Sequence, residues 1–225
     1  MTTPVAACIR RRKSVRAFTD QPVAKDILTR VLDTARHAPS GANTQPWQVA
    51  VLAGRKKAQL QELMEKSFRA GNKGEKDYDY YPQDWQPPYK GRRTSCGKQL
   101  YDALGIDRQD RERRMDQWIA NYRAFDAPVM LLFFIDKSLA TGSYLDYGMF
   151  LQSLMLAAEE EGLATCPQAA LAEYPQLVRE FLHYPENCLL LCGMSLGYED
   201  KQAPVNSYRT PREEVTSFTR FFLDD

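Results

Sequence analysis

Pro128-Val129-Met130-Leu131-Leu132-Phe133-Phe134-Ile135 contains the longest apolar run of the chain, and this stretch decides the fold. A proline followed by seven aliphatic and aromatic residues is typical of a strand. Because the run has no alternation with polar residues, both faces of the strand are expected to be buried. A second run of this kind extends from Asn187 to Leu196. The sequence therefore predicts a sheet that is covered on both sides.

Helical patterns separate the strand-like segments. Ile27, Leu28, Val31, Leu32 and Ala35 recur on one helical face, which predicts a helix over residues 23–36. Further helices are expected over residues 60–68, 99–125, 147–158 and 177–182, and shorter strands over 47–51 and 163–167. Strands separated by long helices indicate one α+β domain over residues 1–225.

Residues 71–97 have a different composition. Tyr78, Tyr80, Tyr81, Trp85 and Tyr89 alternate with prolines and charged residues, and the apolar residues follow neither a helical nor a strand period. Long irregular segments inside a compact domain are usually functional lids or disordered, and the aromatic content favours an ordered lid. The tail over residues 204–225 is polar until three phenylalanines near its end, which indicates packing on a partner subunit.

Composition excludes several classes of protein. Thirty Lys and Arg against 29 Asp and Glu give a formal net charge of +1, which argues against a dedicated nucleic-acid binder. No stretch has the roughly 18 uninterrupted apolar residues of a membrane span. We therefore expect a protein that binds neither nucleic acid nor membrane.

The cysteines and histidines predict neither disulfides nor a metal site. Five cysteines form no C-x-x-C pair, and two histidines lie at no metal-ligand spacing.

The basic run Arg10 to Lys13 has no apolar segment after it, which argues against an export signal. A reducing, cytoplasmic location is expected. Cys166, Cys188 and Cys192 are interpreted as packing residues, the last two on one face of a strand.

Two nucleotide-binding motifs are ruled out. Gly91 and Gly97 enclose five residues and Gln99 follows Lys98, whereas a P-loop needs four residues and then Ser or Thr. The chain also has no G-x-G-x-x-G turn for a Rossmann unit.

Arg12-Lys13-Ser14-Val15-Arg16 is the most informative short motif. In an extended chain, residues two apart share a face, so Arg12, Ser14 and Arg16 would present two guanidinium groups and a hydroxyl to one anion. This composition suits a phosphate. A solvated basic patch near the chain terminus is the alternative interpretation.

Three segments in order resemble the FMN-dependent nitroreductase family. They are Arg12 to Phe18, the loop Ala38 to Trp47, and the helix from Asp146 to Leu163 with its Gly148 and Gln152. Gly193, Leu196, Gly197 and Tyr198 and the late Arg209-Thr210-Pro211 extend the resemblance over nearly the whole chain. Within the family, the Tyr/Pro/Trp-rich insertion and Thr165-Cys166-Pro167-Gln168-Ala169 are most similar to the nitrobenzoate-reductase branch.

The resemblance implies a nitroreductase-like fold with a central, mostly antiparallel sheet and an intertwined homodimer with FMN at the interface. Arg12, Ser14 and Arg209 would hold the phosphate and Lys13 would also contact the cofactor, while Arg16 would reach the pyrimidine edge of the flavin and stabilise its reduced form. The remaining cofactor contacts would be Pro39, Ser40, Gly41 and Asn43 from the neighbouring subunit, and Cys166, Pro167, Gln168 and Ala169.

The implied activity is reduction of nitroaromatic compounds such as nitrobenzoates by NAD(P)H, through ping-pong hydride transfer, to hydroxylamines. No catalytic acid or base is expected, because the chemistry belongs to the flavin. Gly41, Ala42, Tyr81 and Trp85 would contact the small aromatic substrate. The alternatives are a reductive dehalogenase of halogenated tyrosine, a quinone or enone reductase, and a flavin-binding protein without turnover.

Overall fold

The computed structural model describes residues 4–223. Its helices are α1 (Pro4–Arg11), α2 (Lys25–Ala35), α3 (Gly54–Arg69), α4 (Tyr89–Ala103), α5 (Arg111–Ile119), α6 (Gly142–Glu160) and α7 (Pro175–Leu182). Its strands are β1 (Gln48–Ala53), β2 (Val129–Asp136), β3 (Ala164–Gln168) and β4 (Cys188–Gly197). The described residues therefore form the expected α+β fold.

The strands form one antiparallel sheet in the order β1-β2-β4-β3. Strand β2 lies inside the sheet, and its side chains alternate between two hydrophobic clusters. Val129, Leu131, Phe133 and Ile135 pack with α2 and α6, whereas Met130, Leu132 and Phe134 pack with α3 and α7. Burial on both faces of this strand, the prediction from its continuous apolar run, is confirmed.

Strand β4 contains a β-bulge that the sequence pattern did not predict. Phe133 pairs with Cys192 and Phe134 pairs with Leu190, so Leu191 is an extra residue in β4. Because a one-residue insertion reverses the alternation of side chains, Cys188 joins one hydrophobic cluster and Cys192 the other. Both thiols are buried as expected, but the prediction that they share a face is wrong.

Helices α1 and α4 are the elements that periodicity missed. Residues 89–97, expected within the irregular segment, belong to α4, and the helix expected over 99–125 is interrupted after Ala103. Neither α1 nor α4 has a buried residue; α4 carries no apolar stripe, and α1 is only eight residues long, so the pattern on which the prediction depended is absent or short. Gly105 follows α4 at φ +60°, a conformation that favours glycine and ends the helix.

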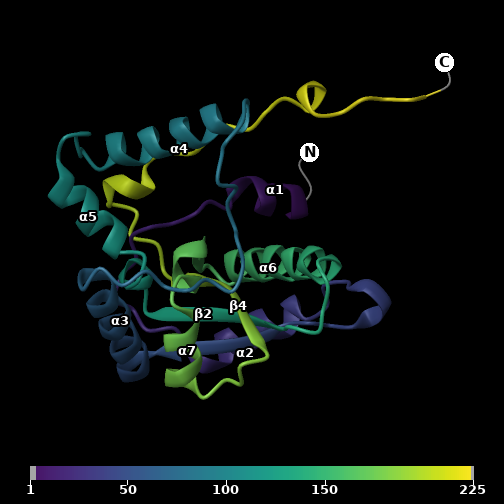
Figure 1. Cartoon of the computed structure of the whole chain (residues 1–225). Helices are drawn as coiled ribbons and strands as arrows, with labels where there is room; N and C mark the ends of the chain where they lie inside the picture. The colour runs from purple at the N-terminus through teal and green to yellow at the C-terminus, as the bar shows by residue number, and fades with distance from the viewer. Residues whose placement is uncertain (1–3, 224–225) are drawn as a thin grey trace.

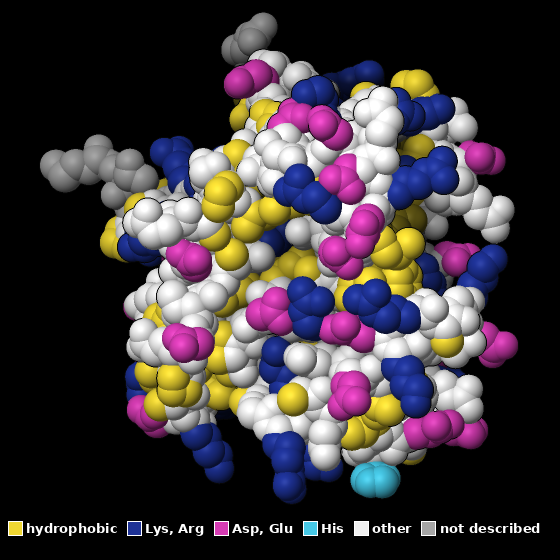
Figure 2. Space-filling model, turned by 90° about the vertical axis from the view of Figure 1, so that its left-hand side faces the viewer, with side chains coloured by type: hydrophobic (Ala, Val, Ile, Leu, Met, Phe, Trp, Pro, Cys, Tyr) yellow, Lys and Arg dark blue, Asp and Glu magenta, His cyan; other side chains and the backbone are white. Residues whose placement is uncertain are grey.

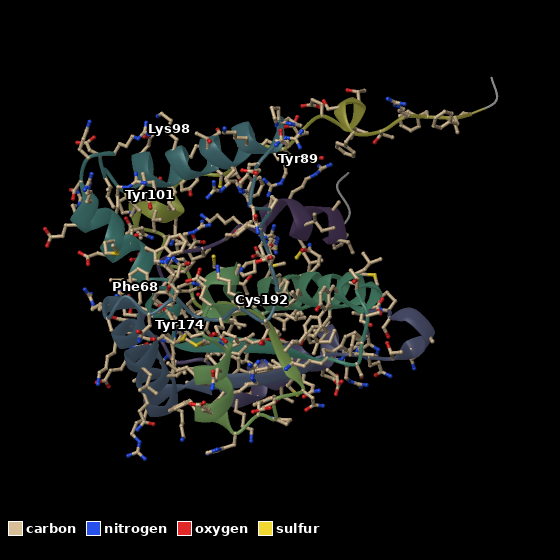
Figure 3. The ribbon with its side chains drawn as sticks, viewed as in Figure 1. Phe68, Tyr89, Lys98, Tyr101, Tyr174 and Cys192 are labelled. Atoms are coloured by element: carbon tan, nitrogen blue, oxygen red, sulfur yellow. The ribbon has the colours of Figure 1, made fainter. Side chains whose placement is uncertain are left out.

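Helix α4 and the C-terminal tail lie outside the packed layers. Figure 1 shows α4 at the upper edge, with the tail passing beside it and then leading away from the body. In Figure 3, Tyr89 and Lys98 on α4 lie well away from Cys192 on the sheet. The face turned to the viewer in Figure 2 carries basic and acidic side chains intermixed around a central apolar area. No described helix is long and apolar enough to cross a membrane.

Candidate functional site

The arm after α1 extends the sheet beyond its edge strand. Val15 is buried and its N–H donates to the carbonyl of Thr165 at 3.0 Å, while Ser14 forms a parallel bridge with Thr165. Since Val15 faces the core, its immediate neighbours Ser14 and Arg16 face the other way. Arg12, Ser14 and Arg16 all line one cavity of about 440 Å³. The structure therefore brings the three residues of the motif together.

The C-terminal segment supplies the opposite wall of this cavity, with Tyr208, Arg209, Thr210 and Arg212. The guanidinium of Arg209 donates to the carbonyls of Arg10 at 2.5 Å and Arg12 at 2.7 Å, and also to that of Arg11. These carbonyls lie at the C-terminal end of α1, where cations are stabilised. Arg209 thus joins the two ends of the chain while lining the cavity.

The environment of Arg12 favours a bound anion more clearly than that of any other residue of this cavity. Its Nε is buried and has no hydrogen-bond acceptor among residues 4–223. Burial lowers the pKa of its guanidinium, and the charges of Arg212 and Arg209 lower it further. A phosphate would supply both the missing acceptor and the opposite charge. The residues of this cavity therefore fit the phosphate of a nucleotide-like cofactor.

Lys13 also lines the cavity, but its amino group has protein partners. Its Nζ donates to the carbonyl of Asn206 at 2.5 Å and pairs with Glu199 at 2.7 Å. The buried Asn206 in turn accepts the N–H of Arg16 at 2.9 Å and donates to the carbonyl of Ala17. Lys13 and Asn206 hold the arm in place, and this arrangement leaves Lys13 less suited to the phosphate than Arg12.

Arg16 separates this cavity from a second one of about 260 Å³, and it lines both. Its guanidinium lies 5.9 Å from the ring centroid of Phe125 and donates to the carbonyl of Ser14 at 3.3 Å. Phe125 has φ +51°, between Ala124 and Asp126, which are also left-handed. Consecutive left-handed residues are strained, and the turn presents the Phe125 ring to Arg16.

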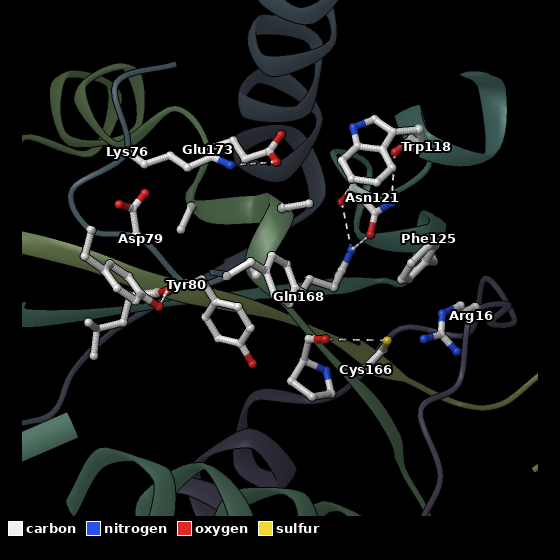
Figure 4. Close-up of a pocket in the computed structure, with 17 residues that line it drawn as sticks. Arg16, Lys76, Asp79, Tyr80, Trp118, Asn121, Phe125, Cys166, Gln168 and Glu173 are labelled. Carbon is white, nitrogen blue, oxygen red and sulfur yellow. Dashed lines mark hydrogen bonds and ion pairs between the residues drawn. The ribbon is translucent and has the colours of Figure 1, made fainter. Parts of the chain in front are cut away.

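The second cavity is assembled from distant parts of the chain, as Figure 4 shows. Its lining comprises Arg16, Lys76, Tyr78, Asp79, Tyr80, Tyr81, Trp118, Asn121, Phe125, Cys166, Pro167, Gln168, Ala169, Ala170, Ala172, Glu173 and Leu191. Arg16 and Phe125 lie at one end, and Lys76, Asp79 and Glu173 lie at the other. Aromatic walls and balanced charges suit a planar ligand.

The expected flavin contacts after β3 lie along this cavity. Cys166, Pro167, Gln168 and Ala169 all line it. The amide of Gln168 is already bonded, because its Nε2 donates to the carbonyl of Asn121 at 3.0 Å and its Oε1 accepts from Ser195. The side chain of Gln168 is therefore occupied, which leaves the backbone of this residue to contact a ligand. The segment lies close to β4 because Gly193 has no side chain: a Cβ there would be 2.4 Å from Leu171 Cδ1.

Cys166 is buried in the wall of this cavity. Burial raises the pKa of its thiol, and the nearby charge of Arg16 opposes that shift. A buried, protonated thiol is a packing residue and a poor nucleophile. The interpretation of Cys166 as apolar filler fits this environment.

The loop expected to reach the cofactor lines neither cavity of its own chain. Pro39, Ser40, Gly41, Ala42 and Asn43 are absent from both linings. The loop is held in shape locally, since Ser40 Oγ accepts the N–H of Gln45 at 3.0 Å and three of its residues are left-handed. Its expected contacts with flavin and substrate therefore require a second subunit.

The two aromatic residues expected at the substrate occupy different positions. Tyr81 lines the second cavity, whereas Trp85 packs behind it with ring centroids 5.7 Å apart. The guanidinium of Arg93 lies 5.3 Å from the Trp85 ring. In this single chain Trp85 therefore supports Tyr81 without lining the cavity.

Sequence reasoning missed several lining residues. Arg212, three positions after Arg209, could have been found as part of a second basic cluster. Trp118, Asn121 and Phe125 carry no local signal, because Trp118 lies on α5, Asn121 follows that helix, and Phe125 lies in the strained turn after it. Within residues 4–223, no group of three His, Cys, Asp or Glu side chains is arranged to hold a metal.

Comparison with known proteins gives one consistent result. The sequence pattern described as "Nitroreductase family" matches residues 9–198. A 4-nitrobenzoate reductase of Pseudomonas putida is 39% identical, over 98% of this chain and 96% of its own length.

Two solved structures are also similar over nearly their whole length. One is an FMN and NADPH-dependent nitroreductase NfnB from sphigopyxis sp. strain HMH, with TM-score 0.95, 37% identity and coverage of 99% of this chain and 100% of that one. The other is an FMN-dependent nitroreductase NfnB from Mycobacterium smegmatis in complex with NADPH, with TM-score 0.92, 34% identity and coverage of 97% and 100%.

Proposed function

Because this chain belongs to the nitroreductase family, we propose that it is an FMN-dependent NAD(P)H oxidoreductase that reduces nitroaromatic compounds, including nitrobenzoates, to hydroxylamines. The observation that carries the proposal is the pair of cavities on either side of Arg16. One is cationic and contains a buried donor without an acceptor, and the other is aromatic with balanced charges.

The larger cavity is proposed to hold the FMN phosphate through Arg12, Ser14 and Arg209. Arg12 offers its unpaired Nε, and Arg209 keeps donors beyond those it uses at the end of α1. Arg212 adds a further positive charge to the same cavity. Lys13 is assigned a supporting role, because its amino group already contacts Asn206 and Glu199.

The smaller cavity is proposed to receive the flavin ring edge and the substrate. FMN, when bound, accepts a hydride from NAD(P)H and passes two electrons to the nitro group. Arg16 would lie beside the pyrimidine edge and stabilise the negative charge of the reduced ring. Cys166, Pro167, Gln168 and Ala169 would place a backbone N–H beside the ring, and Tyr81, supported by Trp85, would cover the substrate.

The overall reaction needs two molecules of NAD(P)H. One nitro group accepts two hydride equivalents and two protons, which gives a hydroxylamine, one water and two molecules of NAD(P)⁺. No acid/base pair of the protein is assigned a role in this reaction, because the hydride chemistry belongs to the flavin. Positioning and the charge of Arg16 are then the protein's main contributions.

A homodimer is proposed to complete both sites. The loop with Pro39, Ser40, Gly41, Ala42 and Asn43 would contact the flavin and substrate bound by the other subunit. The tail carries Phe218, Phe221, Phe222 and Leu223 with exposed fractions of 71%, 69%, 89% and 77%. Four exposed apolar side chains on a segment that leaves the body fit a surface of a partner subunit (Figure 1). Residues 224–225 of this expected tail lie outside the described residues.

A reducing, cytoplasmic location is proposed because all five cysteines are free and NAD(P)H is the electron donor. Reductive dehalogenation of halogenated tyrosine has less support. That branch is expected to place a threonine hydroxyl at the flavin, and the matching position here falls near Ala169, which has no hydroxyl.

The test is spectroscopic and kinetic. Purified protein should show an FMN absorption band, lose it on addition of NADPH or NADH, and regain it on addition of 4-nitrobenzoate. Quinone or enone reduction is compared in the same assay. A protein that takes up no FMN, or whose reduced flavin is not reoxidised by any nitroarene, would contradict the proposal.

The dimer has a separate test. Replacing Phe218, Phe221 and Phe222 together by Ser should weaken association and flavin retention in parallel, because both are proposed to depend on the interface. Analytical ultracentrifugation and the flavin-to-protein absorbance ratio measure the two effects. A variant that stays dimeric with full flavin content would contradict the coupling.

A further inference from the structure

The aromatic segment before α4 consists of two parts with very different attachment to the body. Tyr174 donates its hydroxyl to the carbonyl of Asn72 at 3.0 Å, and Lys76 pairs with Glu173 at 3.5 Å. Gly74 lies against the same chain: a Cβ there would be 1.6 Å from the carbonyl oxygen of Glu173. Residues 72–76 are thus fixed along the segment between β3 and α7.

Asp77 is the strongest attachment. Its Oδ2 accepts from Arg179 at 2.5 Å and from the N–H of Leu190 at 2.8 Å. The Arg179 and Asp77 side chains are only 12% and 8% exposed, and Arg179 also donates to the carbonyl of Cys188. A buried carboxylate with two donors is strongly localised, because losing a partner leaves a desolvated charge.

Tyr78 is attached at the β-bulge of β4. Its hydroxyl donates to the carbonyl of Leu191 at 2.6 Å. Leu191 is the extra residue of the bulge, and it lines the second cavity. Bulges next to binding sites commonly redirect a side chain. Asp77 and Tyr78 therefore contact the sheet at the place where the sheet forms part of the cavity wall.

The following residues are attached mainly to one another. Tyr80 contacts Tyr81 at a centroid distance of 4.6 Å, Tyr81 contacts Trp85, and Trp85 contacts Arg93. Tyr80 and Tyr81 are 57% and 55% exposed. Within the described chain, no hydrogen bond or ion pair ties residues 79–85 to the sheet or to the helices that cover it.

We propose that residues 72–78 are a fixed root, held at the β4 bulge by Asp77 and Tyr78. Opening of the cavity is then confined to residues 79–88, which form the tip of the lid. Asp77 and Arg179 are then positioning residues. They hold Tyr80 and Tyr81 in a fixed position relative to Leu191. One contact therefore fixes the positions of both the lid and the cavity wall. The effect on substrate binding rests on the proposed function, whereas the division into root and tip does not.

Limited proteolysis of the FMN-loaded protein with proteinase K, followed by mass spectrometry, tests the division directly. Cleavage within residues 79–88 should be at least about tenfold faster than cleavage within residues 72–78, because cleavage requires local opening. Asp77→Asn removes the charge of the root and should abolish the difference. If Asp77→Asn does not fold, Gly74→Ala provides the same test, because it pushes the root away from Glu173 without replacing a cavity residue.

Glu75→Gln is the matched control, since Glu75 is an exposed carboxylate in the same segment. Asp77→Asn or Gly74→Ala should raise KM for 4-nitrobenzoate by roughly five- to tenfold with kcat within about twofold, as expected for a loss of uniform binding. Glu75→Gln should leave the cleavage pattern and KM unchanged. Equal cleavage rates in residues 72–78 and 79–88 of the unaltered protein, or an unchanged KM in both root variants, would overturn the proposal.

A failure of the proposed function gives a different pattern. The unaltered protein would then bind no FMN or show no turnover, while limited proteolysis of the protein alone would still decide whether residues 72–78 form a fixed root. A loss of FMN in Asp77→Asn and Gly74→Ala without the KM effect would also overturn the positioning role.

Discussion

The two cavities that meet at Arg16 differ in how their charges are balanced. The larger is lined by Arg10, Arg12, Arg209 and Arg212 and by no acidic residue, whereas the smaller combines Arg16 and Lys76 with Asp79 and Glu173. Burial and the charges of Arg212 and Arg209 lower the pKa of Arg12, so an added anion would stabilise the charged form of Arg12. A balanced aromatic cavity has no such requirement. The larger, uncompensated cavity therefore suits an anionic cofactor that stays bound, and the smaller, balanced cavity suits ligands that enter and leave.

The largest expected effect concerns Arg12. Arg12→Gln should weaken FMN binding by about 3 kcal/mol, roughly 100-fold, because a buried charge-assisted contact to phosphate is lost. The melting temperature of the FMN-free variant should not fall below that of the unaltered protein, because the substitution removes one of several mutually repelling charges. Fluorescence titration with FMN and thermal denaturation without it measure the two quantities.

Arg11→Gln is the matched control for Arg12. Arg11 is adjacent in sequence, but it pairs with Glu159 and lines neither cavity. Its replacement should leave FMN affinity unchanged. Equal weakening in both variants would mean that general positive charge, and not the cavity, binds the cofactor.

Arg16 should separate cofactor electronics from cofactor binding. Arg16→Gln keeps a donor but removes the charge, so much of the FMN should remain bound. A contact of this kind contributes on the order of 1.5–3 kcal/mol to the reduced state. The two-electron midpoint should fall by several tens of millivolts, since about 30 mV corresponds to 1.4 kcal/mol. A redox titration with an unshifted midpoint would place Arg16 away from the ring.

The tip of the aromatic segment should affect only the exchanging ligand. Replacing Tyr81 and Trp85 by Ala should raise KM for nitroarenes by about fivefold, because large rigid contact area is lost. The saturating rate of flavin reduction by NADPH should change much less. Stopped-flow measurement of the two half-reactions distinguishes them, and equal losses in both would assign the tip a structural role.

Replacing Cys166 should have the smallest effect on activity. Burial raises its pKa, so the thiol keeps its proton in the folded state at pH values where it would lose it when unfolded. Its contribution to stability is therefore complete below its unfolded pKa and is lost as pH rises through the folded pKa. Cys166→Ala should change kcat/KM by less than about twofold between pH 6 and 8. A larger loss, with a matching step in the pH profile, would indicate a thiol that takes part in the reaction.

The same two regions explain how far sequence reasoning reached. Arg12, Ser14 and Arg16 lie in five consecutive residues of extended chain, so their common face follows from local geometry. The core strands followed from apolar runs, because burial on both faces leaves a continuous pattern.

The second cavity could not be predicted in this way. Phe125 reaches it through a strained turn, Trp118 from helix α5, and Leu191 from a bulge that depends on pairing with β2. Such features arise from tertiary packing and leave no periodic signal. Helix α4 was missed for a related reason, since a helix with no buried residue has no apolar stripe.

The comparison of affinities for FMN and riboflavin tests the central claim most directly, because the two differ only in the phosphate. We expect the protein freed of flavin to bind FMN at least about 100-fold more tightly than riboflavin, as several charge-assisted contacts to phosphate imply. Equal affinities for FMN and riboflavin would contradict the assignment of the arginine-lined cavity as the phosphate site.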